Sequence, residues 1–271
     1  MCWIGTMLLK LKVIGVLVVT VIAVVVSAIL TVNNITLIPV RSDLNTLSKW
    51  ILSFSYNPLH PLFTALTPAI VNAIVWDYRS IDTFFETSVL FAAVIGAIVI
   101  YYEYLYEKPP RGKGLSPIVK SVVKISMFIA VGLGLAIALK GHMTPAGGFQ
   151  GGTVAAAIIY IMSMTYSLHW LYIRNIRQVS MLTFRTCGLI SLVIVAILPI
   201  LVGLLTGCNA YILQNQPKIN APIGYSYDVG DYRVSLTILM FNIFEFLIVL
   251  AAFTLLLMIL SIASMEKRFP E

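Results

Sequence analysis

The sequence predicts an all-α, polytopic transmembrane helical protein with about six spans, and three observations lead to that prediction. Of its 271 residues, 59% are hydrophobic and 11% are charged, whereas soluble domains contain about 25% charged residues. The mean hydropathy is +0.96. Apolar runs of roughly 20 residues recur along the chain, which is the length that a helix needs to cross a bilayer. These runs do not alternate polar and apolar residues as barrel strands do.

Six charge-poor segments are the expected spans: residues 13–32, 83–102, 117–139, 151–173, 186–205 and 234–261. The third contains Lys120 and Lys124, whose long side chains are expected to extend to the near interface. The first run is longer than the apolar region of a typical signal peptide and lacks a clear small-x-small cleavage site. We therefore interpret it as a retained membrane anchor.

The basic residues predict the orientation. Twelve Lys and Arg residues fall in one set of alternate connections and six in the other, so both termini are expected to be cytoplasmic. The net charge of +7 is scattered through short loops, which does not favour a nucleic-acid partner. The cysteines, Cys2, Cys187 and Cys208, form no CxxC pair, and we expect no metal site and no cofactor.

A polar stretch divides the chain into two parts. Residues 106–117, "YEKPPRGKGLSP", contain helix-breaking Pro and Gly and basic charge, which is typical of a cytoplasmic linker. Residues 1–105 would form a two-span module and residues 118–271 a four-span domain. Within the first part, residues 60–76 are apolar enough either to lie in the membrane interface or to re-enter the membrane, and hydropathy leaves both open.

A charged cluster precedes and enters the second span: Asp77, Arg79, Asp82 and Glu86. Asp82 and Glu86 are four residues apart and share a helix face. Glu86 lies about one turn inside the apolar segment, where a carboxylate must be paired, hydrated or protonated. We expect an ion or proton role for Glu86. For Asp77 and Asp82, capping of the helix or pairing with Arg79 is an equal alternative.

A second acidic residue, Glu245, lies deep in the last expected span. Asn242 is three residues earlier, on the same face, and can share a hydrogen bond or a cation with it. A free carboxylate at this depth is costly, which favours a role in transport. The alternative is a protonated Glu245 that only joins two helices.

The third candidate is "GHMTPAGGFQGG", residues 141–152, between two expected spans. Lys140 and His142 precede Pro145, and Gly147/Gly151 and Gly148/Gly152 form two overlapping GxxxG spacings. A helix break here must face protein or water, and the charge of His142 can change near neutral pH. Tight helix packing alone is the alternative for the glycines. No phosphate-binding loop or Ser or Cys nucleophile pattern occurs.

The same segment resembles the GHxxPGGGFxGG signature of the B subunit of Mrp-type (Mnh) multisubunit Na+/H+ antiporters, which also occurs in the related subunit of archaeal membrane-bound hydrogenases. The matching residues are His142, Pro145, Gly147, Gly148, Phe149, Gly151 and Gly152, while Ala146 replaces a glycine. Glu245 resembles the acidic position of that family's last helix. The resemblance implies a four-span domain.

The first half resembles the C-terminal module of the large A subunit of these antiporters, which is a small separate subunit in hydrogenase-type complexes. Asp77, Arg79, Asp82 and Glu86 match its pattern of acids and arginine. The chain is thus similar to a fusion of two subunits. The resemblance implies a multi-pass cell-membrane subunit of an assembly that exchanges Na+ for H+, alone or driven by a redox arm.

From the residues and the resemblance together we expect an ion or proton path in which Glu86, Glu245 and His142 carry the ion. The expected path also includes Asp77, Arg79, Asp82, Lys140 and Asn242. We expect other membrane subunits and lipid as partners, Na+ and H+ as the transported ions, and no catalysis by this chain itself. The competing expectation is a structural subunit, in which the glycines and acids only pack neighbouring helices.

Overall fold

The computed structural model describes residues 17–18, 20–30 and 43–266. The chain divides into two compact units, residues 1–49 and 50–271, each considered by itself. The first contains an apolar helix, Thr20–Leu30. The rest of the expected span 13–32 lies mainly outside the described residues, so this prediction stays a prediction.

The second unit is built from helices and one short hairpin. The long helices are α4 (Ser80–Ile100), α5 (Pro117–Leu139), α6 (Gly148–Tyr166), α8 (Gln178–Thr206) and α9 (Leu236–Glu266). Shorter elements are α2 (Thr46–Ser55, of which residues 50–55 belong to this unit), η1 (Pro61–Phe63), α3 (Ile70–Ala73), the π-helix η2 (Ile74–Tyr78), η3 (Tyr102–Leu105) and α7 (Leu168–Ile173). Strands β1 (Ser226–Val229) and β2 (Tyr232–Ser235) pair antiparallel, with Ser226 opposite Ser235.

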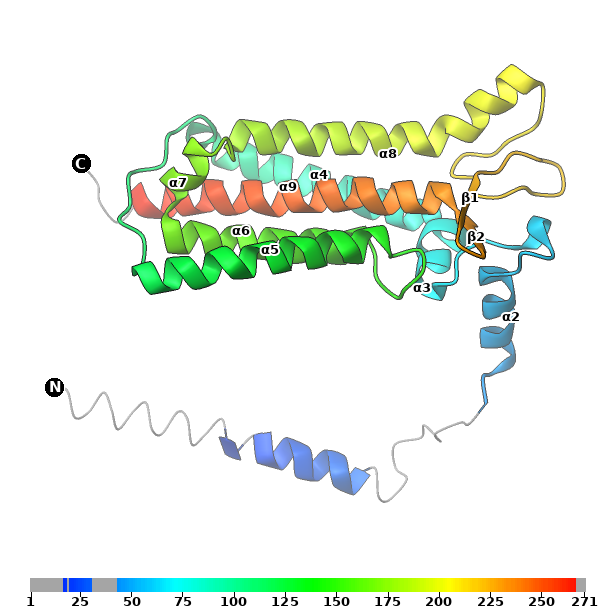
Figure 1. Cartoon of the computed structure of the whole chain (residues 1–271), viewed down its shortest axis with the longest axis horizontal. Helices are drawn as coiled ribbons and strands as arrows, with labels where there is room; N and C mark the ends of the chain where they lie inside the picture. The colour runs from blue at the N-terminus through cyan, green and yellow to red at the C-terminus, as the bar shows by residue number, and fades with distance from the viewer. Residues whose placement is uncertain (1–16, 19, 31–42, 267–271) are drawn as a thin grey trace. The chain divides into compact units, whose positions relative to one another are not determined.

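Helix α9 is the centre of the bundle. It packs against α4, α5, α6 and α8, and Figure 1 shows it running between α8 on one side and α6 on the other. Of its apolar window, 61% is buried, against 17–33% in α4, α5 and α8. A helix that is apolar on every face belongs in an interior, and α9 occupies that interior.

Four of the six expected spans are confirmed by length and composition. Among the described residues, α4, α5, α8 and α9 are the helices long and apolar enough to cross a membrane. The fourth expected span, 151–173, is different: α6 ends at Tyr166, Ser167 has a φ of 110°, and α7 follows. Gly, Gln and Thr residues in α6 lower its hydropathy, and it packs between α5 and α9.

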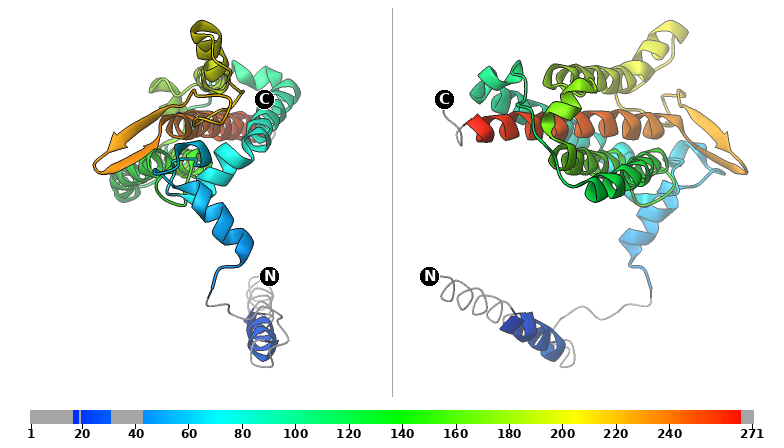
Figure 2. Two further views of the ribbon diagram at one scale, coloured as in Figure 1. Left: turned by 90° about the vertical axis from the view of Figure 1, so that its right-hand side faces the viewer. Right: turned by 60° about the vertical axis from the view of Figure 1, so that its left-hand side comes forward.

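Within the stretch 60–76, residues 60–63 are exposed, and residues 64–67 and Trp76 are buried against protein at one end of the bundle. Trp76 is fully buried and stacks on Phe241 of α9, with ring centroids 4.6 Å apart. Asn215 Nδ2 donates to the carbonyl of Trp76 at 2.5 Å, and Asn215 Oδ1 accepts from Thr237 Oγ1 at 2.7 Å. These bonds join η2, the loop after α8 and the start of α9. Figure 2 shows the β1–β2 hairpin projecting from the same end.

Candidate functional site

A small cavity brings together the two acidic positions that are far apart in the sequence. Its volume is about 170 Å³, and its walls come from α3, η2, α4, α9 and the segment that leads into α6. Glu86 and Glu245 both line it, with the amides Asn72, Asn242 and Gln150. The remaining lining residues are Val71, Val75, Trp76, Thr83, Ala146, Gly147 and Phe149.

Glu245 faces the N-terminus of α6. Its side chain is buried, with 6% of the residue exposed, and the backbone of Phe149 hydrogen-bonds to its carboxylate. The backbone N–H of Gly148 donates to Asn242 Oδ1 at 3.2 Å. The first amides of a helix have no partner within the helix, and its N-terminus carries a partial positive charge. The start of α6 is therefore placed to stabilise negative charge on Glu245.

The glycine at position 148 makes this approach possible. A Cβ built on Gly148 would lie 2.8 Å from Glu245 Cβ and 2.9 Å from Glu245 Oε2, and it would overlap the carbonyl oxygen of Asn242. Carbon atoms in contact are about 3.5–4.0 Å apart. Any side chain here would thus push the start of α6 away from α9.

Glu86 lies at the mouth of the cavity. It is exposed on α4 in this chain, whereas Glu245 is buried, and the two carboxylates interact electrostatically. Two negative groups in one small site repel each other, and a bound cation or a proton relieves that repulsion. The arrangement is therefore suited to hold a monovalent cation or a proton between a buried and an accessible carboxylate.

Asn72 fixes the connection between α5 and α6. Its buried Nδ2 donates to the carbonyl of Gly141 at 2.6 Å and also to the carbonyl of Ala146. Both ends of the 141–146 turn are thereby tied to α3. No function was predicted for Asn72, although an Asn inside the apolar stretch 60–76 is an unusual feature of the sequence.

Asn242 contributes an unused donor. Its Nδ2 is buried and has no hydrogen-bond partner among the described residues. Since buried amide groups are normally satisfied, this N–H group is available to water or to another molecule in the cavity.

The other charged residues of the predicted path lie apart from this cavity. Arg79 and Asp82 form an exposed ion pair at 2.6 Å. Asp77 accepts from Asn215 Nδ2 at 3.1 Å and pairs with Lys218 at 3.7 Å, in a separate pocket. Lys140 is exposed just after α5. No side chain caps the N-terminus of α4.

His142 is buried next to the hairpin. Its Nε2 lies 3.0 Å from Tyr227 Oη, and its carbonyl accepts from Thr67 Oγ1 at 2.5 Å and from the backbone N–H of Ala69 at 3.3 Å. Burial lowers the pKa of His142 below its ordinary value of 6.5. His142 thus joins three segments, and it does not line the cavity.

The predicted glycines contact two different helices. A Cβ on Gly151 would lie 3.1 Å from Ala138 Cβ of α5, and one on Gly152 would lie 2.9 Å from Val249 Cβ of α9. Pro145 lies exposed in the connection before α6, so it ends a turn between two helices. Two GxxxG spacings therefore let α6 approach α5 and α9 closely.

Arg185 lies inside a helix, whereas the expected span that begins at residue 186 leaves it in a connection. Helix α8 begins eight residues earlier than the expected span at 186, so Arg185 lies within it. The residue is fully buried, its guanidinium lies 4.1 Å from the centroid of the Phe91 ring, and its nitrogens have no hydrogen-bond partner among the described residues. The expected span begins directly after Arg185 because a charged residue interrupts the apolar run, and α8 therefore starts earlier than predicted.

Among the residues that the structure describes, no group of three or more His, Cys, Asp or Glu side chains is arranged to hold a metal ion. Any cation in the cavity would thus be held by two carboxylates together with amide and backbone oxygens.

Residues 118–255, about half of the chain, match the family described as "Domain related to MnhB subunit of Na+/H+ antiporter".

Two relatives have similar sequences. The protein named "Uncharacterized protein MJ1307" of Methanocaldococcus jannaschii is 32% identical over 116 residues, which cover 36% of this chain and 44% of that protein. "Putative antiporter subunit mnhB2" of Staphylococcus haemolyticus is 24% identical over 144 residues, which cover 53% of this chain and 93% of that protein. The chain thus spans less than half the length of the first relative and nearly all of the second.

The fold is shared with chains of solved membrane complexes. A chain of the archaeal membrane-bound sulfane sulfur reductase, a respiratory membrane complex, matches with a TM-score of 0.62 and 19% identity over 90% of this chain and 97% of that one. A chain of the Mrp complex from Dietzia sp. matches with a TM-score of 0.56 and 19% identity over 90% of this chain and 25% of that one. At this identity the likeness concerns the fold.

Proposed function

This multi-pass membrane protein belongs to the family of domains related to the MnhB subunit of Na+/H+ antiporters, and we propose that it contributes a Na+ or H+ site to a multisubunit antiporter module. The observation that supports the proposal is that Glu86 and Glu245 line one cavity. Glu245 is the buried acceptor and Glu86 is the accessible one. In the proposal the start of α6, which Gly148 N–H links to Asn242 Oδ1, orients the buried carboxylate.

The likeness of this chain to subunits of larger assemblies supports a role inside a complex. One structural neighbour is part of an Mrp complex and another is part of a respiratory membrane complex. In the proposal the chain works with other membrane subunits, either in a stand-alone antiporter or beside a redox arm. The mouth of the cavity at Glu86 then faces a neighbouring subunit, which continues the path.

The proposal keeps the division into residues 1–105, a linker at 106–117 and residues 118–271. Two contacts support a fixed linker: His169 Nδ1 lies 3.1 Å from the carbonyl of Pro109, and Gln178 Nε2 donates to the carbonyl of Glu107 at 3.0 Å. The basic charge of this end favours a cytoplasmic location for the linker, and hence for both termini.

The remaining charged residues take supporting roles in the proposal. Asp77, Asp82, Arg79 and Lys140 would guide cations toward the membrane surface, and His142 would hold the α5–α6 connection in place. None of these side chains lines the cavity, so their loss is expected to weaken transport less than the loss of Glu245.

A structural role is the second candidate. The close approach of Gly151 to α5 and of Gly152 to α9 favours it, because such contacts serve packing without any ion. In that case the acids would only join helices.

Replacement of Glu245 by Gln in the assembled complex separates the two functions. The amide keeps the size of the side chain and one acceptor oxygen, and it removes the negative charge. We expect Na+-dependent proton movement in inverted vesicles, followed by the fluorescence of a pH-sensitive dye, to fall about tenfold or more.

Glu103→Gln is the matched control, since Glu103 is an exposed acid outside the cavity. Its transport should equal that of the unaltered complex, and native gels should show normal assembly for both variants. Normal transport by an assembled Glu245→Gln complex would remove Glu245 from the path and leave the structural role.

A further inference from the structure

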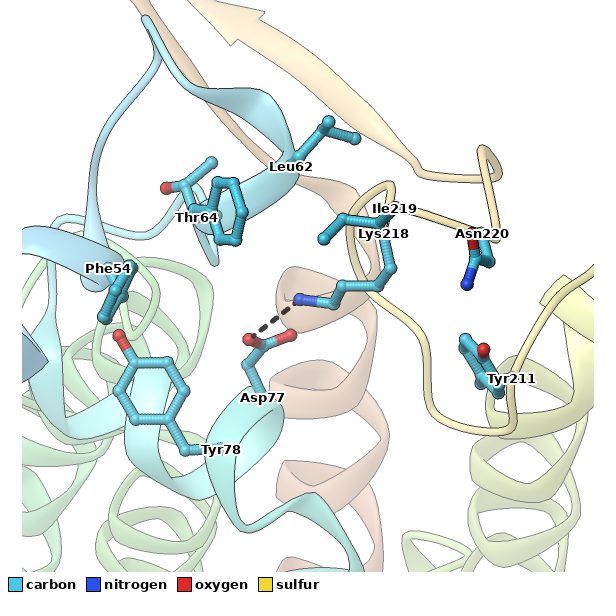
Figure 3. A pocket seen from close by; sticks show the side chains of 10 residues that line it. Phe54, Leu62, Thr64, Asp77, Tyr78, Tyr211, Lys218, Ile219 and Asn220 are labelled. Carbon is cyan, nitrogen blue, oxygen red and sulfur yellow. Dashed lines mark ion pairs between the residues drawn. The ribbon is translucent and has the colours of Figure 1, made fainter.

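A second and larger cavity lies at the end of the bundle where α4 and α9 begin and α8 ends. Its volume is about 480 Å³, which is within the usual range of about 300–1,000 Å³ for ligand pockets. Phe54 and Leu62 lie on one side of it, and the loop that carries Lys218 and Ile219 lies on the other. Phe63 also lines it. Figure 3 shows the two walls facing each other across Asp77 and Tyr78 of η2.

The position of this pocket corresponds to the membrane surface. Asp77 lies three residues before α4, which is long and apolar enough to cross a membrane. The pocket is therefore at the level where the hydrocarbon region ends and the headgroups begin. Tyr and Trp side chains prefer that level, and Tyr78 and Tyr211 line the pocket.

The walls expose apolar side chains that no other residue described by the structure covers. Leu62 is 42% exposed, Phe63 is 51% exposed and Ile219 is 71% exposed. An apolar group seated between them would remove this surface from water, which is favourable by about 25 cal/mol per Å². The apolar part of the pocket therefore fits a hydrocarbon chain.

The polar part of the pocket presents a cation. The Lys218 side chain is 38% exposed, while the Asp77 side chain beneath it is 9% exposed. Their charged atoms are 3.7 Å apart, which is longer than the roughly 2.7–2.9 Å of a strong charge-assisted hydrogen bond. Asp77 also accepts from Asn215 at 3.1 Å. The carboxylate is thus held from below, and the Lys218 ammonium keeps donors for an anion above it.

We propose that this pocket binds a phospholipid, with its phosphate at Lys218 and one acyl chain against Leu62, Phe63 and Phe54. A hydrocarbon chain attached directly to an anionic head matches both halves of the pocket, and the bilayer supplies such molecules at this level. A free phosphate ion would leave the apolar walls uncovered. This binding site is independent of the proposed ion site, because the two cavities share no lining residue.

The test measures lipid retained by the purified full chain. Native mass spectrometry after mixing with phosphatidylglycerol should detect one bound lipid, and Lys218→Gln should lower the retained fraction about fivefold. Lys218→Arg should restore it. Arg233→Gln, which removes an exposed cation of the same end that does not line the pocket, should retain lipid normally.

Two further arms identify the occupant. Leu62→Trp fills the apolar half of the pocket and should reduce lipid retention without changing the melting temperature. This variant tests the site even if Lys218→Gln fails to fold. Millimolar inorganic phosphate should not displace the lipid. Equal retention by all variants, displacement by phosphate, or loss of the lipid when the chain is assembled with its partner subunits would each overturn the proposal.

Discussion

Replacing Gly148 by Ala tests whether the contact between α6 and α9 builds the site. The added Cβ would lie 2.8 Å from Glu245 Cβ and would also meet the backbone carbonyl oxygen of Asn242. A backbone oxygen cannot rotate away, so the two helices must separate by about 1 Å to reach normal contact distances. Overpacking of this kind costs about 1–3 kcal/mol.

For a chain of this length, about 2 kcal/mol corresponds to a fall in melting temperature of roughly 4–8 °C. Thermal unfolding of the purified chain in detergent, followed by size-exclusion chromatography of a fluorescent fusion, measures this shift. Gly132→Ala is the matched control, because a Cβ at Gly132 of α5 meets nothing within 4 Å. Ala favours a helix over Gly, so the control should melt at the same or a higher temperature. Equal melting of both variants would refute the packing argument.

Two other predictions concern buried basic groups. Arg185→Met should unfold at the same or a higher temperature than the unaltered chain, because the guanidinium of Arg185 has no hydrogen-bond partner among the described residues and replacing a buried charge by an apolar side chain of similar volume is often stabilising by about 1–4 kcal/mol. Arg185→Ala should melt lower because it leaves a cavity, and a large loss in the Met variant would instead reveal an anionic partner. For His142, burial lowers the pKa of the imidazole in the folded chain, so the unfolded chain binds the proton more tightly. The contribution of neutral His142 to the free energy of unfolding is therefore complete above about pH 6.5, and it is lost as the pH falls from there toward the folded pKa. Melting temperatures between about pH 5 and pH 7.5 should therefore rise with pH, and His142→Gln should flatten that rise; an unchanged slope would contradict this assignment.

The long elements could be predicted from the sequence because hydrophobic length alone determines them. The expected span at 117–139 coincides with α5. The last expected span begins at residue 234, two residues before the start of α9. The start of α8 was missed because the segment before residue 186 contains Arg185, and a charge ended the apolar run. The break at Ser167 was missed because a single residue with positive φ leaves no pattern in the sequence.

The candidate site could be predicted in its parts but not in its assembly. The cost of a carboxylate in a membrane span identified Glu86 and Glu245 individually. That they share a cavity depends on how α4 and α9 pack, which spacing within one helix does not encode. Asn72 was missed for the same reason, since its partners Gly141 and Ala146 are about seventy residues further along the chain.

The central position of α9 has a consequence for biogenesis. Helices α4, α5, α6 and α8 all pack on it, and yet it is translated after every one of them. During synthesis the earlier helices therefore enter the bilayer before α9 is available to pack against them. Small residues such as Gly152, which contacts α9 in the folded chain, have no partner there until α9 has been synthesised. A ribosome that stalls before residue 236 would release helices that have no common core, which makes completion of the chain the step that commits the bundle to its final arrangement.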